Sequence, residues 1–362
     1  MSVTIDISGL GKESFRFLPS ALAELGSALH LIVEPAHHAS QQDWIRRTLE
    51  AIDADLMDRL QTADFLWRTS RADMLLPAHP GASLGEELDA LDRLSDETWV
   101  NAALITSSCG VVPLHPELKS PLVDPAARKL ARDRAGVRGQ RQLDFVDFVL
   151  SEPAKVRAWV RTLLEDCENA FFAVAWEQIV GSLKRDARQK HDLLLSSGIS
   201  SALEAVSEAV TLDRSGHRIV VDKLQDRGTS AAGQGVTFLP SAFGHPHLLV
   251  VHAPGWQPVI QYPVTELASP AITGLEALQE RIHALDHPVR LRLVRSLLRS
   301  PLTTLELAET WQLSAPEVSR HLAVLKEAGI VDSSRQGRFV RYDINLLVTA
   351  RLGTDLIEAL QR

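Results

Sequence analysis

The segment 314–344 limits the fold more than any other, because it joins a capped amphipathic helix directly to an alternating hairpin. Ser314 and Glu317 have the spacing of a capping box, in which the serine hydroxyl accepts from the Glu317 N–H and the carboxylate reaches back. Three apolar residues then recur at helical spacing and are expected to face a core: Val318, Leu322 and Leu325. The opposite side carries Ser319 and Arg320, a short and a basic residue of the kind that enter the major groove of DNA.

The hairpin begins after Gly329, a residue suited to the left-handed end of a helix. Residues 330–335 and 338–344 are expected to be its two strands. Apolar residues that alternate along the second strand are predicted to pack on the domain: Val340, Tyr342 and Ile344. Arg335 and Arg338 then lie at the tip, where they can reach the phosphates or the minor groove of DNA.

Helices are also expected ahead of this segment. Apolar residues at three- and four-residue spacing predict one helix over 275–285 and a second that begins near Pro288, where a missing N–H costs little. Thr303 or Thr304 has the place of a cap for a third helix. Helices followed by a recognition helix and a hairpin predict a winged helix-turn-helix domain over 275–362.

Charge is unevenly distributed along the chain. The formal net charge of −8 by itself argues against a nucleic-acid partner. From Arg290 to Arg341, however, nine basic residues stand against five acidic ones. The sequence therefore predicts a basic module attached to an acidic body, an arrangement that limits binding to unrelated DNA.

Residues 281–344 resemble the ArsR/SmtB family of bacterial repressors, above all in LDHPVRLRLVRSLL, LTTLELAETWQLSAPEVSRHLAVLKEAGIV and RQGRFVRYDI. The resemblance implies a homodimer that reads a palindromic operator in double-stranded DNA, with the first and last helices of the winged domain at the interface. Residues 345–362 are expected to supply that last helix. The positions expected to contact DNA are Ser314, Ala315, Glu317, Ser319, Arg320, Lys326, Arg335, Arg338 and Arg341.

The metal sites known in this family are not expected here. The third helix, TTLELAET, has no cysteine, and no histidine follows Asp355 in the last helix. We therefore expect no metal and no cofactor, and we expect His283, His287 and His321 to be structural or solvent-facing. Control by a signal other than a metal ion follows from this reasoning.

The long N-terminal region is predicted to be mainly helical, with apolar residues at helical spacing in segments such as 15–33, 43–61 and 155–167. Short β-branched runs follow, RIVVDKL, GVTFLP, HLLVVHAP and PVIQYPV, and we expect them to form one small sheet of three or four strands. The stretch from VTFLP to QYPV also resembles the extension found in one branch of ArsR-like regulators.

The predicted fold class is therefore mainly α with a small β component. The chain is expected to begin with a helical N-terminal domain over 1–215, which has a sensor or interaction role. A short β-rich segment over 216–268 is expected to pack with this domain. The winged helix-turn-helix domain over 275–362 follows and ends in a dimerisation helix.

No recognised motif predicts catalysis in the N-terminal region. The sequence has no phosphate-binding loop, HExxH, GxSxG or GxGxxG. Cys109, near His115, is interpreted as a small buried residue rather than a nucleophile. Several histidines have loose metal-like spacing, but no carboxylate or cysteine completes a set, so loop and strand-edge roles are expected: His37, His38, His245, His247 and His252. No catalytic residue is proposed.

The leading hypothesis is a dimeric repressor controlled by a non-metal ligand or a partner that the N-terminal region senses. Six of the seven tryptophans lie before the winged domain, so an aromatic pocket for a small-molecule effector is one interpretation and ordinary core filling is the other. An enzyme, or an interaction scaffold, with a winged helix as a docking module is the alternative. Without a signal peptide or a long apolar run, we expect a cytoplasmic protein with no membrane partner.

Overall fold

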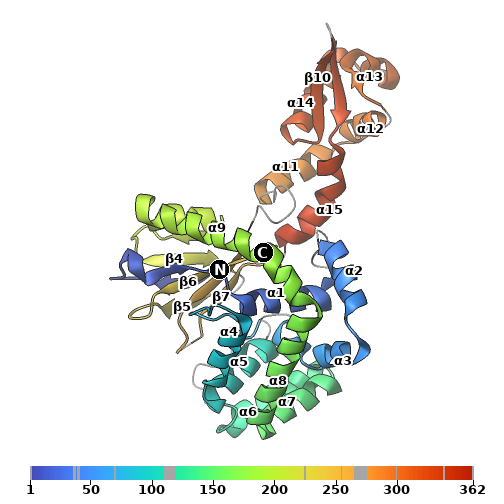
Figure 1. Cartoon of the computed structure of the whole chain (residues 1–362). Coiled ribbons are helices and arrows are strands. Elements are labelled where there is room, and N and C mark those ends of the chain that lie inside the picture. The colour runs from blue at the N-terminus through green and yellow to red at the C-terminus, as the bar shows by residue number, and fades with distance from the viewer. Residues whose placement is uncertain are drawn as a thin grey trace. The chain divides into compact units, whose positions relative to one another are not determined.

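A computed structural model of the chain divides into two compact units, Met1–Ser269 and Pro270–Arg362 (Figure 1). Each has its own apolar core. The structure describes residues 2–35, 38, 41–68, 71–109, 120–223, 226–253, 255–264, 275–298, 300–336 and 339–360. None of the helices in these ranges is long and apolar enough to cross a bilayer.

The N-terminal unit combines a helical body with two sheets (Figure 1). Its helices are α1 (Ala21–Val33), α2 (Gln42–Ala51), α3 (Ala54–Thr62), α4 (Leu84–Asp92), α5 (Asp96–Cys109), α6 (Pro125–Arg138), α7 (Gln140–Ser151), α8 (Pro153–Cys167), α9 (Ala173–Ser197) and α10 (Ile199–Val206). A π-helical turn at Glu168–Phe172 joins α8 to α9.

Two of the predicted helical segments are interrupted, in each case by a capping residue. Segment 43–61 divides into α2 and α3 because Asp53 accepts from the Leu56 N–H at 2.8 Å and starts a new helix. Segment 15–33 begins as a strand, and its helix starts only after Ser20, which accepts from the Ala23 N–H at 3.0 Å. Segment 155–167 is helical throughout, as predicted.

The strands of this unit form two four-stranded sheets, in the orders β3-β4-β1-β5 and β2-β6-β8-β7. Their bounds are β1 (Ser2–Asp6), β2 (Phe15–Phe17), β3 (Val210–Leu212), β4 (Arg218–Asp222), β5 (Arg227–Ser230), β6 (Val236–Ser241), β7 (Leu249–Val251) and β8 (Val259–Pro263). All four predicted runs contain a strand, but the expectation of one sheet is wrong. The predicted runs are divided between the two sheets, and each sheet includes one early strand. β1 lies between β4 and β5 in the first sheet, and β2 pairs with β6 in the second.

Aromatic side chains fill the cores of this unit. Trp67 and Trp99 are fully buried in the helical core. Phe17 of β2 stacks on Phe238 of β6, with ring centres 4.6 Å apart, in the core between the sheets and α9. Burial of this kind favours core filling over an aromatic ligand pocket as the role of these side chains.

The C-terminal unit is a winged helix (Figure 1). Its elements are α11 (Leu275–Leu285), α12 (Pro288–Leu297), β9 (Leu302–Thr303), α13 (Thr304–Trp311), α14 (Ala315–Glu327), β10 (Val331–Gln336), β11 (Phe339–Ile344) and α15 (Leu346–Leu360). Its strands form a sheet in the order β10-β11-β9, whose short third strand was not predicted. The chain as a whole is mainly α with a β component, as predicted from the sequence.

Candidate nucleic-acid interface

The start of α14 is fixed by Ser314, whose hydroxyl accepts from the Glu317 N–H at 3.3 Å. The reciprocal bond expected for a capping box is not among the described hydrogen bonds of this helix. A complete box lies instead at the start of α13, where Glu306 N–H donates to Thr303 Oγ1 and Thr303 N–H donates to the Glu306 carboxylate. Both helices of the helix-turn-helix therefore have defined first residues.

The two sides of α14 differ as the periodicity predicts. Three residues of the inner side are completely buried: Val318, Leu322 and Leu325. Ser314, Ser319, Arg320 and Lys326 are exposed, whereas Ala315 and Glu317 are half-buried. Arg320 thus extends from the first half of an ordered helix, the position from which a guanidinium can meet guanine O6 and N7.

The wing is a regular antiparallel hairpin in which Arg335 of β10 lies opposite Val340 of β11. Arg335 is exposed, and Arg338 lies outside the described residues. The expectation that Val340 packs on the domain is wrong, because this side chain is 44% exposed, whereas Ile344 is 8% exposed. The base of the hairpin packs on the helices, whereas Arg335 and Val340, farther out, are exposed to solvent.

Two of the expected DNA contacts already have polar partners inside this unit. Lys326 Nζ donates to Ser333 Oγ at 2.7 Å across α14 and β10. Arg341 is half-buried in the middle strand and lies 3.9 Å from a Glu306 carboxylate oxygen. The Arg341 arrangement favours a structural role, because its guanidinium is turned toward α13.

Two histidines of this unit, His287 and His321, contact neighbouring groups, whereas His283 is exposed. His287 Nδ1 accepts from the Val289 N–H at 3.2 Å and so caps α12. The rings of His287 and His321 are 4.6 Å apart. Burial, followed by the charges of His287 and Arg290, lowers the pKa of His321.

The first and last helices of this unit pack together. Arg281 of α11 forms a 3.1 Å ion pair with Asp355 of α15, whose side chain is buried. Three apolar side chains of these helices are nevertheless exposed, Ile282 at 41%, Ile357 at 48% and Leu360 at 72%. The α11/α15 pair therefore presents apolar surface that the unit itself does not cover.

Buried polar groups distinguish the N-terminal unit. The Glu24 carboxylate accepts from Ser241 Oγ and from the N–H groups of Ala242 and Phe243, and burial raises its pKa to about 7. Arg71 donates to Gln261 at 3.3 Å, and burial lowers its pKa to about 10. A network of this kind holds α1 against the end of β6 and the middle of β8.

Three histidines meet in the same unit: His30, His38 and His247. The spacing of His38 and His247 in the sequence was noted, but both were expected to have loop or strand-edge roles. Nothing in the sequence singled out His30, which lies on the last turn of α1. His252 stands apart and donates to the Val250 carbonyl at 3.1 Å, and His37 lies outside the described residues. Long-range packing of the chain brings this cluster together, so no sequence spacing could reveal it.

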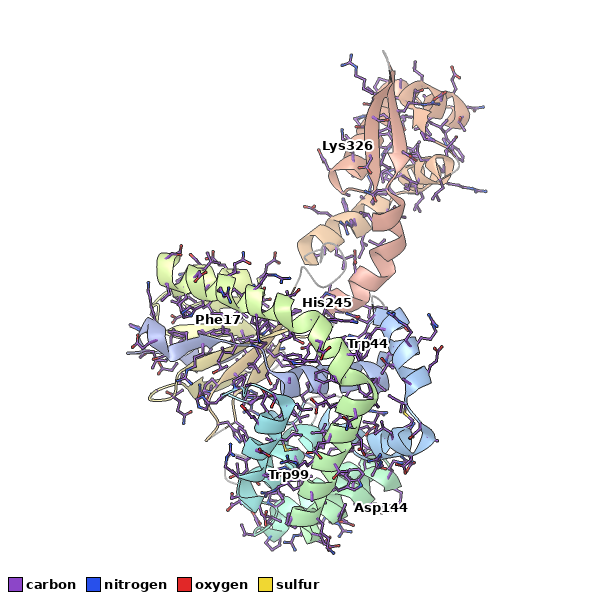
Figure 2. All side chains as sticks on the ribbon, in the orientation of Figure 1. Phe17, Trp44, Trp99, Asp144, His245 and Lys326 are labelled. Carbon is purple, nitrogen blue, oxygen red and sulfur yellow. The ribbon has the colours of Figure 1, made fainter. Side chains whose placement is uncertain are left out.

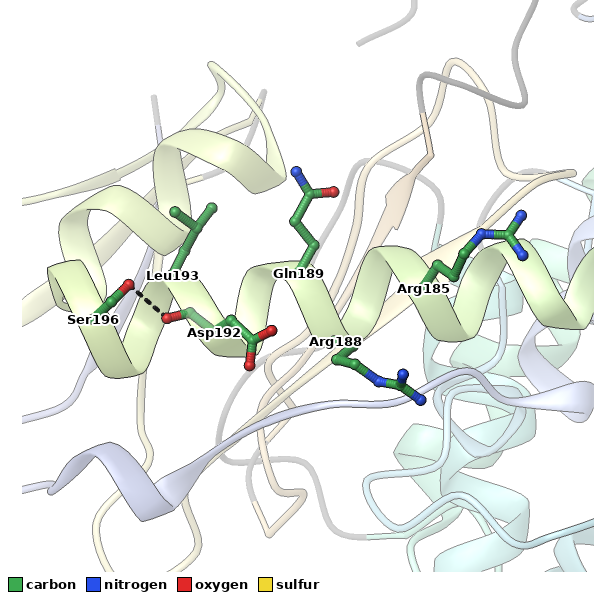
Figure 3. Close-up of a pocket in the computed structure, with 6 residues that line it drawn as sticks. All are labelled: Arg185, Arg188, Gln189, Asp192, Leu193 and Ser196. Atoms are coloured by element: carbon green, nitrogen blue, oxygen red, sulfur yellow. Dashed lines mark hydrogen bonds between the residues drawn. The ribbon is translucent and has the colours of Figure 1, made fainter.

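A shallow depression of about 370 Å³ lies on the outer side of α9 (Figure 3). Its walls are Arg185, Arg188, Gln189, Asp192, Leu193 and Ser196. No aromatic side chain lines it, so this depression does not match the aromatic effector pocket that the sequence suggested. The side chains of Cys109 and His115 lie outside the part of the chain for which side chains are described.

Comparison with known proteins agrees with this division into two units. Residues 1–268 match the model of a family described as "Family of unknown function (DUF5937)". Residues 287–333 match the model described as "Bacterial regulatory protein, arsR family". The chain belongs to the DUF5937 family and carries an ArsR-family helix-turn-helix domain. The resemblance noted in the sequence is thereby confirmed.

Individual relatives each match about a fifth to a quarter of this chain. The HTH-type transcriptional repressor SmtB of Mycobacterium tuberculosis is 40% identical over 75 residues, 21% of this chain and 56% of SmtB. The chain thus spans little more than half the length of that relative. The transcriptional repressor SdpR of Bacillus subtilis is 32% identical over 65 residues, 18% of this chain and 72% of SdpR.

Two further matches are similar in extent. The HTH-type transcriptional regulator YgaV of Escherichia coli is 36% identical over 93 residues, 25% of this chain and 93% of YgaV. A crystal structure titled as an ArsR family transcriptional regulator is 27% identical, covers 24% of this chain and 89% of its own, and has a TM-score of 0.22.

Proposed function

We propose that this protein is a DNA-binding transcriptional repressor whose affinity for its operator is controlled through the N-terminal unit. The single observation that carries the proposal is the outer side of α14, where Ser319 and Arg320 are exposed on a helix with a fixed start. Its relatives SmtB and SdpR are named as transcriptional repressors. In this proposal the N-terminal unit senses a signal and has no catalytic role, and the protein acts in the cytoplasm.

The DNA contacts divide into two kinds. Residues at the start of α14 read base edges: Ser314, Ala315, Glu317, Ser319 and Arg320. Lys326 and the wing arginines Arg335 and Arg338 contact phosphates or the minor groove, which positions the domain without reading sequence. Arg341 contributes least, because it is half-buried and faces Glu306.

The repressor is proposed to be a homodimer joined through α11 and α15. Ile282, Ile357 and Leu360 support this interface, because they are exposed apolar side chains on the two helices. Two copies related by a twofold axis present two recognition helices to a palindromic operator, with half-sites about one helical turn apart.

The test is binding of the purified chain to the promoter region of its own gene, measured by fluorescence anisotropy beside unrelated DNA. Arg320→Ala is expected to weaken specific binding about 5- to 150-fold, the range for one bidentate guanine contact. Arg185→Ala is the matched control, since Arg185 is an exposed arginine of α9. Equal binding to both DNAs, or equal affinities of the Arg320→Ala variant and the unchanged chain, would contradict the proposal.

A further inference from the structure

We propose that His30, His38 and His247 form a binding site for one divalent first-row transition-metal ion within the N-terminal unit. His30 lies on α1, His38 follows that helix, and His247 lies between β6 and β7. His30 and His38 are buried and His247 is half-buried, so the cluster is enclosed but reaches the surface on one side. The site does not depend on DNA binding, and it revises the expectation of no metal.

The positions of the three rings fit a single ion. Their candidate ligand nitrogens all lie within 4.8 Å of one another, and the Nε2 atoms of His30 and His247 are 3.2 Å apart. Imidazoles bound to a tetrahedral ion through bonds of about 2.0–2.1 Å have ligand nitrogens about 3.3 Å apart and ring centres about 5 Å apart. The observed ring-centre separations are 4.9, 5.1 and 5.2 Å.

Mutual orientation of the rings supports the same arrangement. Each pair of rings is nearly perpendicular, with interplanar angles of 74°, 78° and 86°. Three imidazoles that stack face to face would instead hold their nitrogens in parallel planes. Crossed rings can direct one nitrogen each toward a shared centre, as three protein ligands of one ion require.

Hydrogen bonds behind two of the rings select the nitrogens that would bind the ion. His30 Nδ1 lies 2.9 Å from the Trp67 carbonyl oxygen, and His38 Nδ1 lies 2.7 Å from that of His245, a residue labelled in Figure 2. A carbonyl oxygen can only accept, so Nδ1 carries the proton and Nε2 of a neutral ring keeps its lone pair. A backbone carbonyl is one of the common partners of the second ring nitrogen of a metal-bound histidine.

The ligand set indicates the class of ion. Three imidazoles without a thiolate suit Zn²⁺, Co²⁺, Ni²⁺ or Cu²⁺ and not the hard ions Mg²⁺ and Ca²⁺, which take oxygen ligands. Three protein ligands leave a fourth position for water or an exogenous anion. His30 also lies in the last turn of α1, where the helix carbonyls favour positive charge.

A hydrogen-bonded histidine pair is the competing interpretation, because 3.2 Å between His30 and His247 also fits an N–H···N bond. In that case the third ring has no role in binding. His38 therefore discriminates between the two, since a metal site needs all three rings and a hydrogen-bonded pair needs only two.

The experiment uses the full chain, stripped of metal and titrated with Zn²⁺ by calorimetry and with Co²⁺ by visible absorption. One ion per chain is expected, with the absorption of a tetrahedral nitrogen-ligated Co²⁺ site. His247→Gln and His38→Gln are each expected to weaken Zn²⁺ binding at least 100-fold, more than the 10- to 100-fold typical of lost second-shell partners. Circular dichroism checks that each variant folds, and half-buried His247 is the safer of the two positions.

Two controls locate the site. His217→Gln removes an exposed histidine of the same unit and is expected to leave the affinity unchanged. His321→Gln tests the pair of histidines in the C-terminal unit. No binding of Zn²⁺ at micromolar concentrations, or affinity lost in His321→Gln but kept in His247→Gln, would overturn the proposal. Since DNA is absent from every titration, these results are independent of whether the protein is a repressor.

Discussion

The side chains proposed to bind ligands lie in different surroundings in the two units. In the C-terminal unit Arg320, Lys326 and Arg335 are exposed on α14 and the wing. In the N-terminal unit Glu24 and Arg71 are buried at the junction of α1 with β6 and β8. Charge on a surface is available to a large polyanion such as DNA. Buried charges and imidazoles can be reached only by a ligand small enough to enter the protein interior, such as a metal ion.

The contrast extends to how each unit is assembled. The winged helix is built from neighbours in sequence, such as the hairpin β10–β11 and the consecutive helices α13 and α14. The N-terminal unit joins residues more than two hundred positions apart, for example Ser27 and Gln261 at 3.0 Å. A substitution in the winged helix is therefore expected to have a local effect. A substitution in the N-terminal unit is expected to affect that unit as a whole.

Leu322→Ala is the largest expected effect and tests whether the units are energetically separate. Leu322 is completely buried in the winged-helix core, so truncation is expected to destabilise that unit by about 2–5 kcal/mol. Differential scanning calorimetry would then show the C-terminal transition at lower temperature and the N-terminal transition unchanged. Leu305→Ala, at a position 60% exposed, is the matched control. One transition that moves as a whole would remove the distinction between the units.

Asp73→Asn tests the buried charges of the N-terminal unit. Burial raises the pKa of Asp73 from 3.8 to about 7, so between these values the folded chain keeps a proton that the unfolded chain releases. Stability from this group is therefore full below pH 4 and falls as the pH rises toward 7. At pH 8 the variant is expected to be more stable by up to about 4 kcal/mol, since one pKa unit corresponds to about 1.4 kcal/mol.

Urea unfolding followed by tryptophan fluorescence at pH 5 and pH 8 measures this difference. Asp192→Asn, an exposed aspartate of α9, is the control. Glu24 and Glu87, whose pKa values burial also raises to about 7, will leave part of the pH dependence in place. If the unchanged chain and the Asp73→Asn variant lose the same stability between pH 5 and pH 8, ionisation of the Asp73 carboxyl does not destabilise the fold.

Arg335→Ala is expected to have the smallest effect. It tests whether an exposed wing arginine contributes more to DNA binding than one that lies near a carboxylate of its own unit. Loss of one phosphate contact is expected to reduce the slope of log K against log salt by about 1. Arg341→Ala should leave the slope nearly unchanged, because Arg341 is half-buried near Glu306. Operator titrations at several salt concentrations measure both slopes, and a larger change for Arg341 than for Arg335 would reverse the assignment.

Sequence reasoning succeeded where the physics is local. The helical period of Val318, Leu322 and Leu325 identified the inner side of α14, and Ser314 identified its start. It failed at Val340, because alternation along a strand does not show where the body beneath that strand ends. The mistake has a physical cause in the length of the hairpin, which extends past the helices that could cover it.

The way in which the elements of the N-terminal unit come together was beyond such reasoning for the opposite reason. The runs that became β4, β6, β7 and β8 were found, but their division between two sheets depends on β1 and β2. The histidine cluster depends on the same closure, since His30 and His247 are 217 positions apart. Periodicity describes single elements and carries no information on which distant elements meet.

The insertion of β1 between β4 and β5 has a consequence for synthesis on the ribosome. β1 is translated long before its partners, and β2 likewise precedes β6. Both early strands must therefore remain unpaired while about two hundred residues emerge, a delay of tens of seconds at elongation rates of roughly 5–20 residues per second. Exposed strand edges in that interval are open to wrong pairing, so the nascent chain is a predicted client of chaperones.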